Sequence, residues 1–203
     1  MEQIDVAIVG GGVVGLATAL ETAGRGYSTC ILERRARLGQ EASTHNSGVI
    51  HAGLYYPPNS LKAKLCLEGQ QRIYAFCRKH DIPHEQPGKF IVATEKSEIP
   101  QIELIATRGQ SAGANDLEIV DRSFFRRREP HVEGFAALWS PSTGIVDSEA
   151  LIRSLTRLAV NADVILLLST QIDGGVLRPQ GIELRTPRET ILARAVVNAG
   201  GLH

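Results

Sequence analysis

The chain has 203 residues, and 43% of them are apolar, which is enough to bury a core in one large domain or two small ones. Its 22 basic side chains balance 22 acidic ones, so there is no overall charge to attract nucleic acid or an anionic membrane surface. The one dense basic run, Arg126-Arg127-Arg128, is interpreted as a solvated helix face. These features argue against a nucleic-acid-binding protein and indicate a soluble globular one.

Cysteine usage and the first residues of the chain bear on its compartment. Cys30, Cys66 and Cys77 are odd in number and lack the C-x-x-C spacing of metal and redox sites, so we expect free thiols, a reducing compartment and no bound metal. The N-terminus is acidic where a signal peptide would be basic, and no segment reaches the roughly 18 uninterrupted apolar residues of a membrane span. The sequence therefore predicts a cytoplasmic protein without a transmembrane segment, and it leaves peripheral membrane association open.

The beginning of the chain has the pattern of a dinucleotide site. The β-branched run 4–9 predicts a strand buried on both faces of a parallel sheet. Gly10, Gly12 and Gly15 follow as G-x-G-x-x-G, and the small residues of 16–23 predict a helix close to the strand. Such glycines allow a tight turn and the approach of a phosphate, and the helix N-terminus offers free N–H groups to a pyrophosphate.

A second predicted strand, 28–32, ends at Glu33. At this spacing an acidic side chain can meet the ribose hydroxyls of an adenosine, which also disfavours a 2′-phosphate. Strand, glycines, helix, strand and acid in this order predict a dinucleotide site, with a purely structural Gly-rich turn as the alternative. The pattern alone does not distinguish FAD from NAD.

Two segments, 40–56 and 60–66, closely resemble the L-2-hydroxyglutarate dehydrogenase/oxidase group of FAD-dependent oxidoreductases, which are related to D-amino acid oxidase. Further similar segments, spread over the rest of the chain, are 88–93, 128–130, 141–147 and 196–202. Thr44 departs from the group, which more often has glycine there. The chain is also about half as long as such enzymes, so a truncated protein is expected.

The resemblance implies an α/β fold with a Rossmann-like FAD-binding domain on a parallel central sheet, and part of an inserted mixed α+β substrate domain. The FAD-binding domain would comprise 1–80 and 145–203, and the partial substrate domain 81–144. The other elements predicted from the sequence are a helix from Leu61 to about His80 capped by Ser60, strands 89–94, 117–120, 135–139, 164–172, 181–185 and 191–198, a helix to about Gln110 capped by Ser97, a helix after Asp147, and a hairpin turn at Asp173-Gly174-Gly175.

Contacts to FAD are expected from the glycine loop, the end of the second strand, the segment after it and the region near the C-terminus. The residues are Gly10, Gly12, Val13, Val14, Gly15, Glu33, Arg34, Ser43, Asn46, Ser47, Gly48, Ile172, Ala199 and Gly200. The backbone near Ile172 would face the adenine. For Ser43, Asn46 and Ser47 an ordinary N-cap and turn is the alternative.

His51 is the expected catalytic base. Oxidation of a 2-hydroxy acid moves a hydride from C2 to flavin N5 while a base takes the hydroxyl proton, and an imidazole suits that role. A structural histidine bonded to the backbone or stacked near the ring is the alternative. His45 is a weaker candidate because it lies nearer the expected phosphate end, and a covalent bond between a histidine and the flavin is less favoured.

A dicarboxylate substrate requires cationic partners or several N–H groups, and Lys62 and Lys64 follow the flavin segment directly. Because they are two residues apart on a helix, at most one points inward, and both can be solvated instead. The dipeptide Tyr55-Tyr56 either walls the site or anchors the loop.

The resemblance thus implies an FAD-dependent oxidoreductase acting on CH–OH groups, which oxidises L-2-hydroxyglutarate to 2-oxoglutarate and passes electrons to oxygen or a quinone. The alternatives are a related FAD oxidase of amines, amino acids or glycerol 3-phosphate, and a truncated, non-catalytic nucleotide-binding fragment.

Overall fold

The computed structural model describes residues 3–202. It divides into two compact units, one formed by Met1–Asn46 with Ser148–His203 and the other by Ser47–Asp147. The divisions therefore fall near residues 46 and 147, whereas the expected domain boundaries lay near 80 and 144. The reason is that the chain leaves the first unit soon after its second strand and returns only with helix α5 (Ser148–Asn161).

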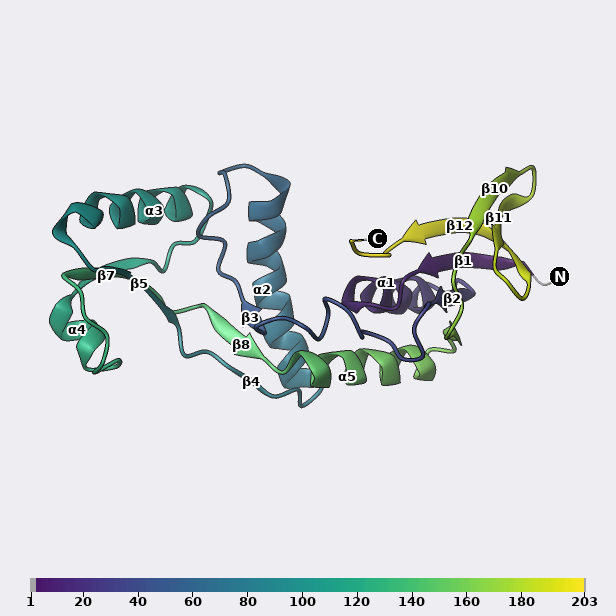
Figure 1. Ribbon diagram of the computed structural model, residues 1–203, viewed down its shortest axis with the longest axis horizontal. Helices are drawn as coiled ribbons and strands as arrows, with labels where there is room; N and C mark the ends of the chain where they lie inside the picture. Colours follow the sequence, from purple (N-terminus) through teal and green to yellow (C-terminus); the bar gives the residue numbers. More distant parts are fainter. Residues whose placement is uncertain (1–2, 203) are drawn as a thin grey trace. The chain divides into compact units, whose positions relative to one another are not determined.

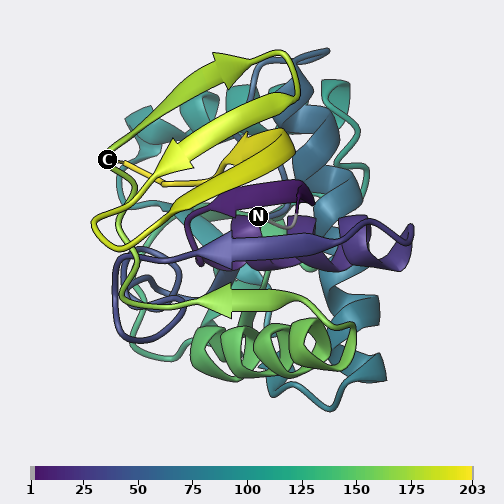
Figure 2. The same cartoon turned by 90° about the vertical axis from the view of Figure 1, so that its right-hand side faces the viewer.

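The first unit is built on a six-stranded sheet of order β10-β11-β12-β1-β2-β9, whose strands follow one another from top to bottom in Figure 2. The strands are β1 (Ile4–Val9), β2 (Thr29–Leu32), β9 (Ile165–Leu167), β10 (Gly174–Arg178), β11 (Gly181–Arg185) and β12 (Thr190–Asn198). Strands β12, β1, β2 and β9 are parallel, while β10 and β11 extend the sheet in antiparallel pairing. The expected α/β fold with a parallel central sheet is confirmed.

Two helices, α1 (Val13–Gly24) and α5, pack against each other in this unit (Figure 1). Helix α1 buries Leu16 and Ala19, which lie on one helical face. Its Gly15 allows close approach to the sheet, because a Cβ there would overlap the Gly10 carbonyl and lie 3.4 Å from Ile8 Cγ2.

Two predictions for this unit are wrong. The strand expected over 164–172 is confined to β9, because the chain turns away at Ser169, whose φ is +51°. The hairpin turn expected at Asp173-Gly174-Gly175 lies instead between Arg178 and Gly181. Gly174 and Gly175 lie in β10 and pair with β11. Gly181 has a φ of +146° and no room for a Cβ beside the Ala193 carbonyl, so the turn requires glycine there.

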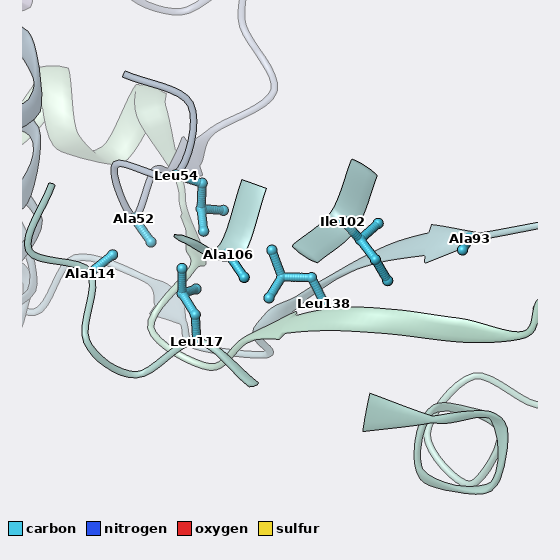
Figure 3. Close-up of a cluster of buried hydrophobic side chains, with 8 residues drawn as sticks. All are labelled: Ala52, Leu54, Ala93, Ile102, Ala106, Ala114, Leu117 and Leu138. Atoms are coloured by element: carbon cyan, nitrogen blue, oxygen red, sulfur yellow. The ribbon is translucent and has the colours of Figure 1, made fainter. Parts of the chain in front are cut away.

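The second unit contains two three-stranded sheets, β3-β8-β4 and β5-β7-β6. Their strands are β3 (Val49–Ile50), β4 (His84–Glu85), β5 (Lys89–Ala93), β6 (Glu118–Asp121), β7 (Ala136–Ser140) and β8 (Gly144–Val146). Its helices are α2 (Leu61–Lys79), the 3₁₀ helix η1 (Lys96–Glu98), α3 (Ile99–Ser111) and α4 (Arg122–Arg126). Figure 3 shows its core, in which Leu138 of β7 lies among Ile102 and Ala106 of α3.

Two helix N-caps were predicted in this unit, and one of them is confirmed. The Ser60 hydroxyl caps α2 as expected, accepting a hydrogen bond from Ala63 N at 3.1 Å. Ser97 is not a cap, because η1 begins earlier with a capping box between Glu95 and Glu98.

None of the helices within residues 3–202 is long and apolar enough to cross a membrane.

Candidate cofactor-binding site

The glycine loop after β1 joins the carboxyl ends of three strands. Gly10 N donates a 2.8 Å hydrogen bond to Leu32 O at the end of β2, and Ala199 N beyond β12 donates one of 2.8 Å to Val9 O. Gly10 has a φ of +106°, and a Cβ on it would overlap the Ala199 carbonyl. Gly10 and Ala199 are therefore brought together at the sheet edge where α/β proteins bind nucleotides.

The N-terminus of α1 is open to an anion. Gly12 is its N-cap in extended conformation, and its first turn carries no acidic side chain that would neutralise the positive end of the helix dipole. Ser43 Oγ accepts a 2.9 Å hydrogen bond from Val13 N and would lie 2.9 Å from a Cβ on Gly12. Val14 is 63% exposed beside them. Backbone N–H groups and the Ser43 hydroxyl thus converge at this helix end, as a pyrophosphate requires.

The Glu33 carboxylate fastens the glycine loop to the turn after β2. Its Oε2 accepts a 2.8 Å hydrogen bond from Gly11 N, and its Oε1 accepts one of 2.7 Å from Arg35 N. A carboxylate offers about four acceptor sites, so acceptor capacity remains for ribose hydroxyls. The sequence argument missed Gly11, although three consecutive glycines signalled it; a Cβ there would overlap Leu38 Cδ2.

The segment after Glu33 is held largely by its own side chains. The Arg34 guanidinium pairs with the Glu41 carboxylate at 2.7 Å. Thr44 Oγ1 donates to Gly39 O at 2.7 Å, and Asn46 Nδ2 donates to Ala42 O at 3.0 Å. In this structure the side chains of Arg34, Thr44 and Asn46 thus stabilise the turn, while the Ser43 hydroxyl faces the glycine loop.

Of the FAD contacts expected near the C-terminus, Gly200 and Ile172 differ in their surroundings. Gly200 N donates a 3.0 Å hydrogen bond to Asn198 Oδ1, which fixes the backbone directly after β12 and next to Gly10. Ile172 is half-buried and packs against the core cluster that contains Ala7 and Leu184. The structure therefore brings Gly200 to the glycine loop and gives Ile172 a packing contact in the sheet core.

Ser47, Gly48 and His51 belong to the second unit. Gly48 has a φ of +65° and pairs with Val146, whose N–H donates to Gly48 O at 2.8 Å. The exposed His51 ring makes no hydrogen bond within the described part of the chain, while its backbone carbonyl accepts one of 3.5 Å from Cys66 Sγ. His45 is the weaker candidate base. Its ring Nδ1 lies 3.0 Å from Glu41 O, a hydrogen-bond contact that the His51 ring lacks among the described residues.

The residues of the first unit fit FAD. Glycines stand where a Cβ would collide, a helix N-terminus lacks acidic side chains, and a carboxylate with spare acceptor capacity follows the second strand. The FAD dependent oxidoreductase family matches residues 5–203. The chain belongs to this family. Its membership confirms the expected cofactor, FAD.

Several curated relatives of this chain share one name. The protein from Nematostella vectensis, "L-2-hydroxyglutarate dehydrogenase, mitochondrial", is 51% identical over 148 residues, which are 72% of this chain and 32% of the relative. The human protein of that name is 38% identical over 174 residues, 85% of this chain and 38% of that one. The chain thus spans about a third of the length of the curated relatives it matches.

Solved structures support the same family. L-α-glycerophosphate oxidase from Mycoplasma pneumoniae, solved with FAD bound, has a TM-score of 0.89 and 28% identity and covers 97% of this chain and 53% of its own. Glycine oxidase from Geobacillus kaustophilus also has a TM-score of 0.89, with 26% identity over 99% of this chain and 56% of its own.

The expected cytoplasmic location is contradicted, because the curated relatives are named as mitochondrial. Unpaired cysteines indicate a reducing environment without saying which compartment supplies it. They therefore could not decide the location of this protein.

Proposed function

We propose that this chain is part of an FAD-dependent enzyme that oxidises L-2-hydroxyglutarate to 2-oxoglutarate. The observation that carries the proposal is the 51% identity to a protein named L-2-hydroxyglutarate dehydrogenase over 72% of the chain. Oxygen or a quinone is the proposed electron acceptor. In this proposal Met1–Asn46 with Ser148–His203 is the cofactor unit, and Ser47–Asp147 contributes to the substrate side.

The chain's own residues perform binding and proton transfer in the proposed mechanism. The α1 N-terminus and Ser43 would hold the pyrophosphate of FAD, and Glu33 would accept hydrogen bonds from its ribose hydroxyls. When bound, FAD supplies an acceptor for the hydride that leaves C2. His51 takes the proton of the substrate hydroxyl, so that the carbonyl of 2-oxoglutarate forms as C2 is oxidised.

His51→Gln tests this role in the FAD-loaded protein. We expect kcat for L-2-hydroxyglutarate to fall by roughly 10²–10⁴-fold, the usual contribution of a general base, while the visible flavin spectrum stays unchanged. His45→Gln is the matched control and should leave kcat within about twofold, since that ring bonds locally to Glu41. Unchanged kcat in His51→Gln would remove His51 from the mechanism.

A related oxidase of amino acids, amines or glycerol 3-phosphate is the second candidate. The likeness to solved glycerophosphate and glycine oxidases favours it. Steady-state turnover of L-2-hydroxyglutarate, glycine and glycerol 3-phosphate separates the two: turnover of either of the latter without the former would refute our first proposal. A colourless protein that does not take up added FAD would instead favour a non-catalytic fragment.

A further inference from the structure

Two lysines from different elements converge on one pair of tyrosines in the second unit. Lys62 Nζ, from the first turn of α2, lies 4.6 Å from the centroid of the Tyr56 ring. Lys89 Nζ, from the start of β5, lies 4.9 Å from the centroid of the Tyr55 ring. The two ammonium groups thus contact the rings of two consecutive residues of one loop.

Neither ammonium group has a carboxylate partner among the described residues. Within residues 3–202, no carboxylate oxygen lies within 4.0 Å of Lys62 or Lys89, whereas Arg25, Arg122 and Arg178 each pair with a glutamate. Lys89 is half-buried, and burial lowers the pKa of its ammonium group. Desolvation of an ammonium group costs free energy, which the ring face offsets in part and a bound anion would offset further.

Lys62 is linked to the candidate base through Cys66. Cys66 Sγ donates to His51 O, and Lys62 lies four residues before Cys66, hence on the same face of α2. The Lys62 charge acts on the Cys66 thiol as well, opposing the rise in its pKa that burial causes. The Lys62 side chain is thus on the side of α2 that faces the His51 backbone.

We propose that Lys62 and Lys89 bind the two carboxylates of a dicarboxylate substrate, one ammonium group to each, with Tyr55 and Tyr56 forming the wall beside them. This assignment rests on the proposed function and names its specificity-determining residues. Lys64, which the sequence placed beside Lys62 as a candidate, is exposed and contacts no ring among the described residues. Lys89 could not be predicted from the sequence, because it lies on strand β5, distant in sequence from the tyrosines.

The single tryptophan provides a readout that does not require turnover. Trp139 packs on Gly88, the residue before Lys89, and pairs with Phe90 across β5 and β7. We titrate the FAD-loaded protein with glutarate, which has both carboxylates but no oxidisable hydroxyl, and follow Trp139 fluorescence. A saturable change is expected, and butyrate, with one carboxylate, should bind at least tenfold more weakly.

Single substitutions locate the binding groups. Lys62→Gln and Lys89→Gln should each weaken glutarate at least tenfold, and Lys89→Arg, which keeps the charge, should restore binding to within about threefold. Lys64→Gln is the control for charge on α2. Lys96→Gln is the control for a ring-bound lysine, since Lys96 Nζ lies 5.6 Å from the Phe135 centroid. Both controls should bind glutarate like the unchanged protein.

Equal binding of glutarate and butyrate, or unchanged glutarate binding in a folded Lys62→Gln or Lys89→Gln protein, overturns the inference. Circular dichroism establishes folding, and Lys89→Met, which keeps the apolar stem, replaces Lys89→Gln if that variant unfolds. The two proposals fail separately. Glutarate binding that depends on both lysines without turnover of L-2-hydroxyglutarate refutes only the proposed function, and turnover with lysine-independent binding refutes only this inference.

Discussion

Gly10 occupies the most crowded backbone position of the cofactor loop. It combines a φ of +106° with a carbonyl, that of Ala199, where a Cβ would lie. Gly10→Ala should therefore lower the free energy of unfolding by about 3 kcal/mol, as left-handed strain and a backbone clash add. Urea unfolding measures the loss, and the stabilisation that added FAD gives to the unchanged protein should disappear.

Gly26→Ala separates the two causes. Gly26 has a φ of +84° but nothing within 4 Å of where an alanine methyl group would lie, so only the strain of about 1–2 kcal/mol remains. Its response to FAD should be retained. Equal losses in both variants would show that contact with Ala199 contributes nothing.

Cys30 makes stability depend on alkaline pH. Burial raises the pKa of its thiol from 9.0 to about 11. The unfolded chain releases this proton above pH 9 while the folded chain keeps it, so the contribution is complete below pH 9 and is lost as pH rises to about 11. At about 1.36 kcal/mol for each pKa unit, about 2–3 kcal/mol is at stake.

The test compares the free energy of unfolding in urea at about pH 8 with that at about pH 10.5. Cys30→Ala has no thiol to titrate, so it should lose less free energy of unfolding between the two pH values than the unchanged chain. Tyrosines and lysines titrate in both proteins and cancel in the comparison. Identical losses would contradict a desolvated Cys30.

At the scale of elements, helix α2 depends on its first turn. Ser60 Oγ accepts a hydrogen bond from Ala63 N, one of the N–H groups that a helix start leaves unpaired. Ser60→Ala should lower the free energy of unfolding by about 1 kcal/mol. Ser97→Ala is the matched control, because the Ser97 hydroxyl bonds the exposed Glu95 side chain and is not a helix cap, and it should change stability by less than about 0.5 kcal/mol.

Elements whose signal is local could be predicted from the sequence. The apolar run of β1 and the Ser60 cap of α2 were predicted correctly, since neighbouring residues alone decide them. The turn expected at Asp173-Gly174-Gly175 was wrong because two glycines look alike in a turn and in a strand until the pairing partner, β11, is known. Among the site residues, Gly10 lies in the loop that the glycine pattern indicated. The contact of Ser43 with that loop and the hydrogen bond from Gly11 N to Glu33 depend on the folded structure and could not be predicted from the sequence.

At the scale of the whole molecule, the first unit exposes apolar side chains at a sheet edge. Strand β10 is the last strand of the described sheet beside β11, and its Leu177 is 81% exposed. A sheet edge with an exposed leucine favours association with a second copy. We expect the chain to self-associate in sedimentation velocity experiments, and Leu177→Lys to reduce the associated fraction at least twofold.

Leu104→Lys is the control for this prediction. Leu104 is 42% exposed but lies on helix α3, which offers no strand edge. It should leave association unchanged. A monomeric unchanged chain would contradict the role of the β10 edge.

The pairing of β1 with β12 bears on how the chain folds while it is being synthesised. Ile4 pairs with Ala193, so the centre of this sheet joins segments far apart in the sequence, while Ser47–Asp147 is continuous. During translation the continuous unit therefore has all its residues before the sheet can close. The glycine loop packs against Ala199, so it cannot take its final form until that residue has emerged from the ribosome. The nucleotide site is therefore assembled after the unit that is inserted into it in sequence.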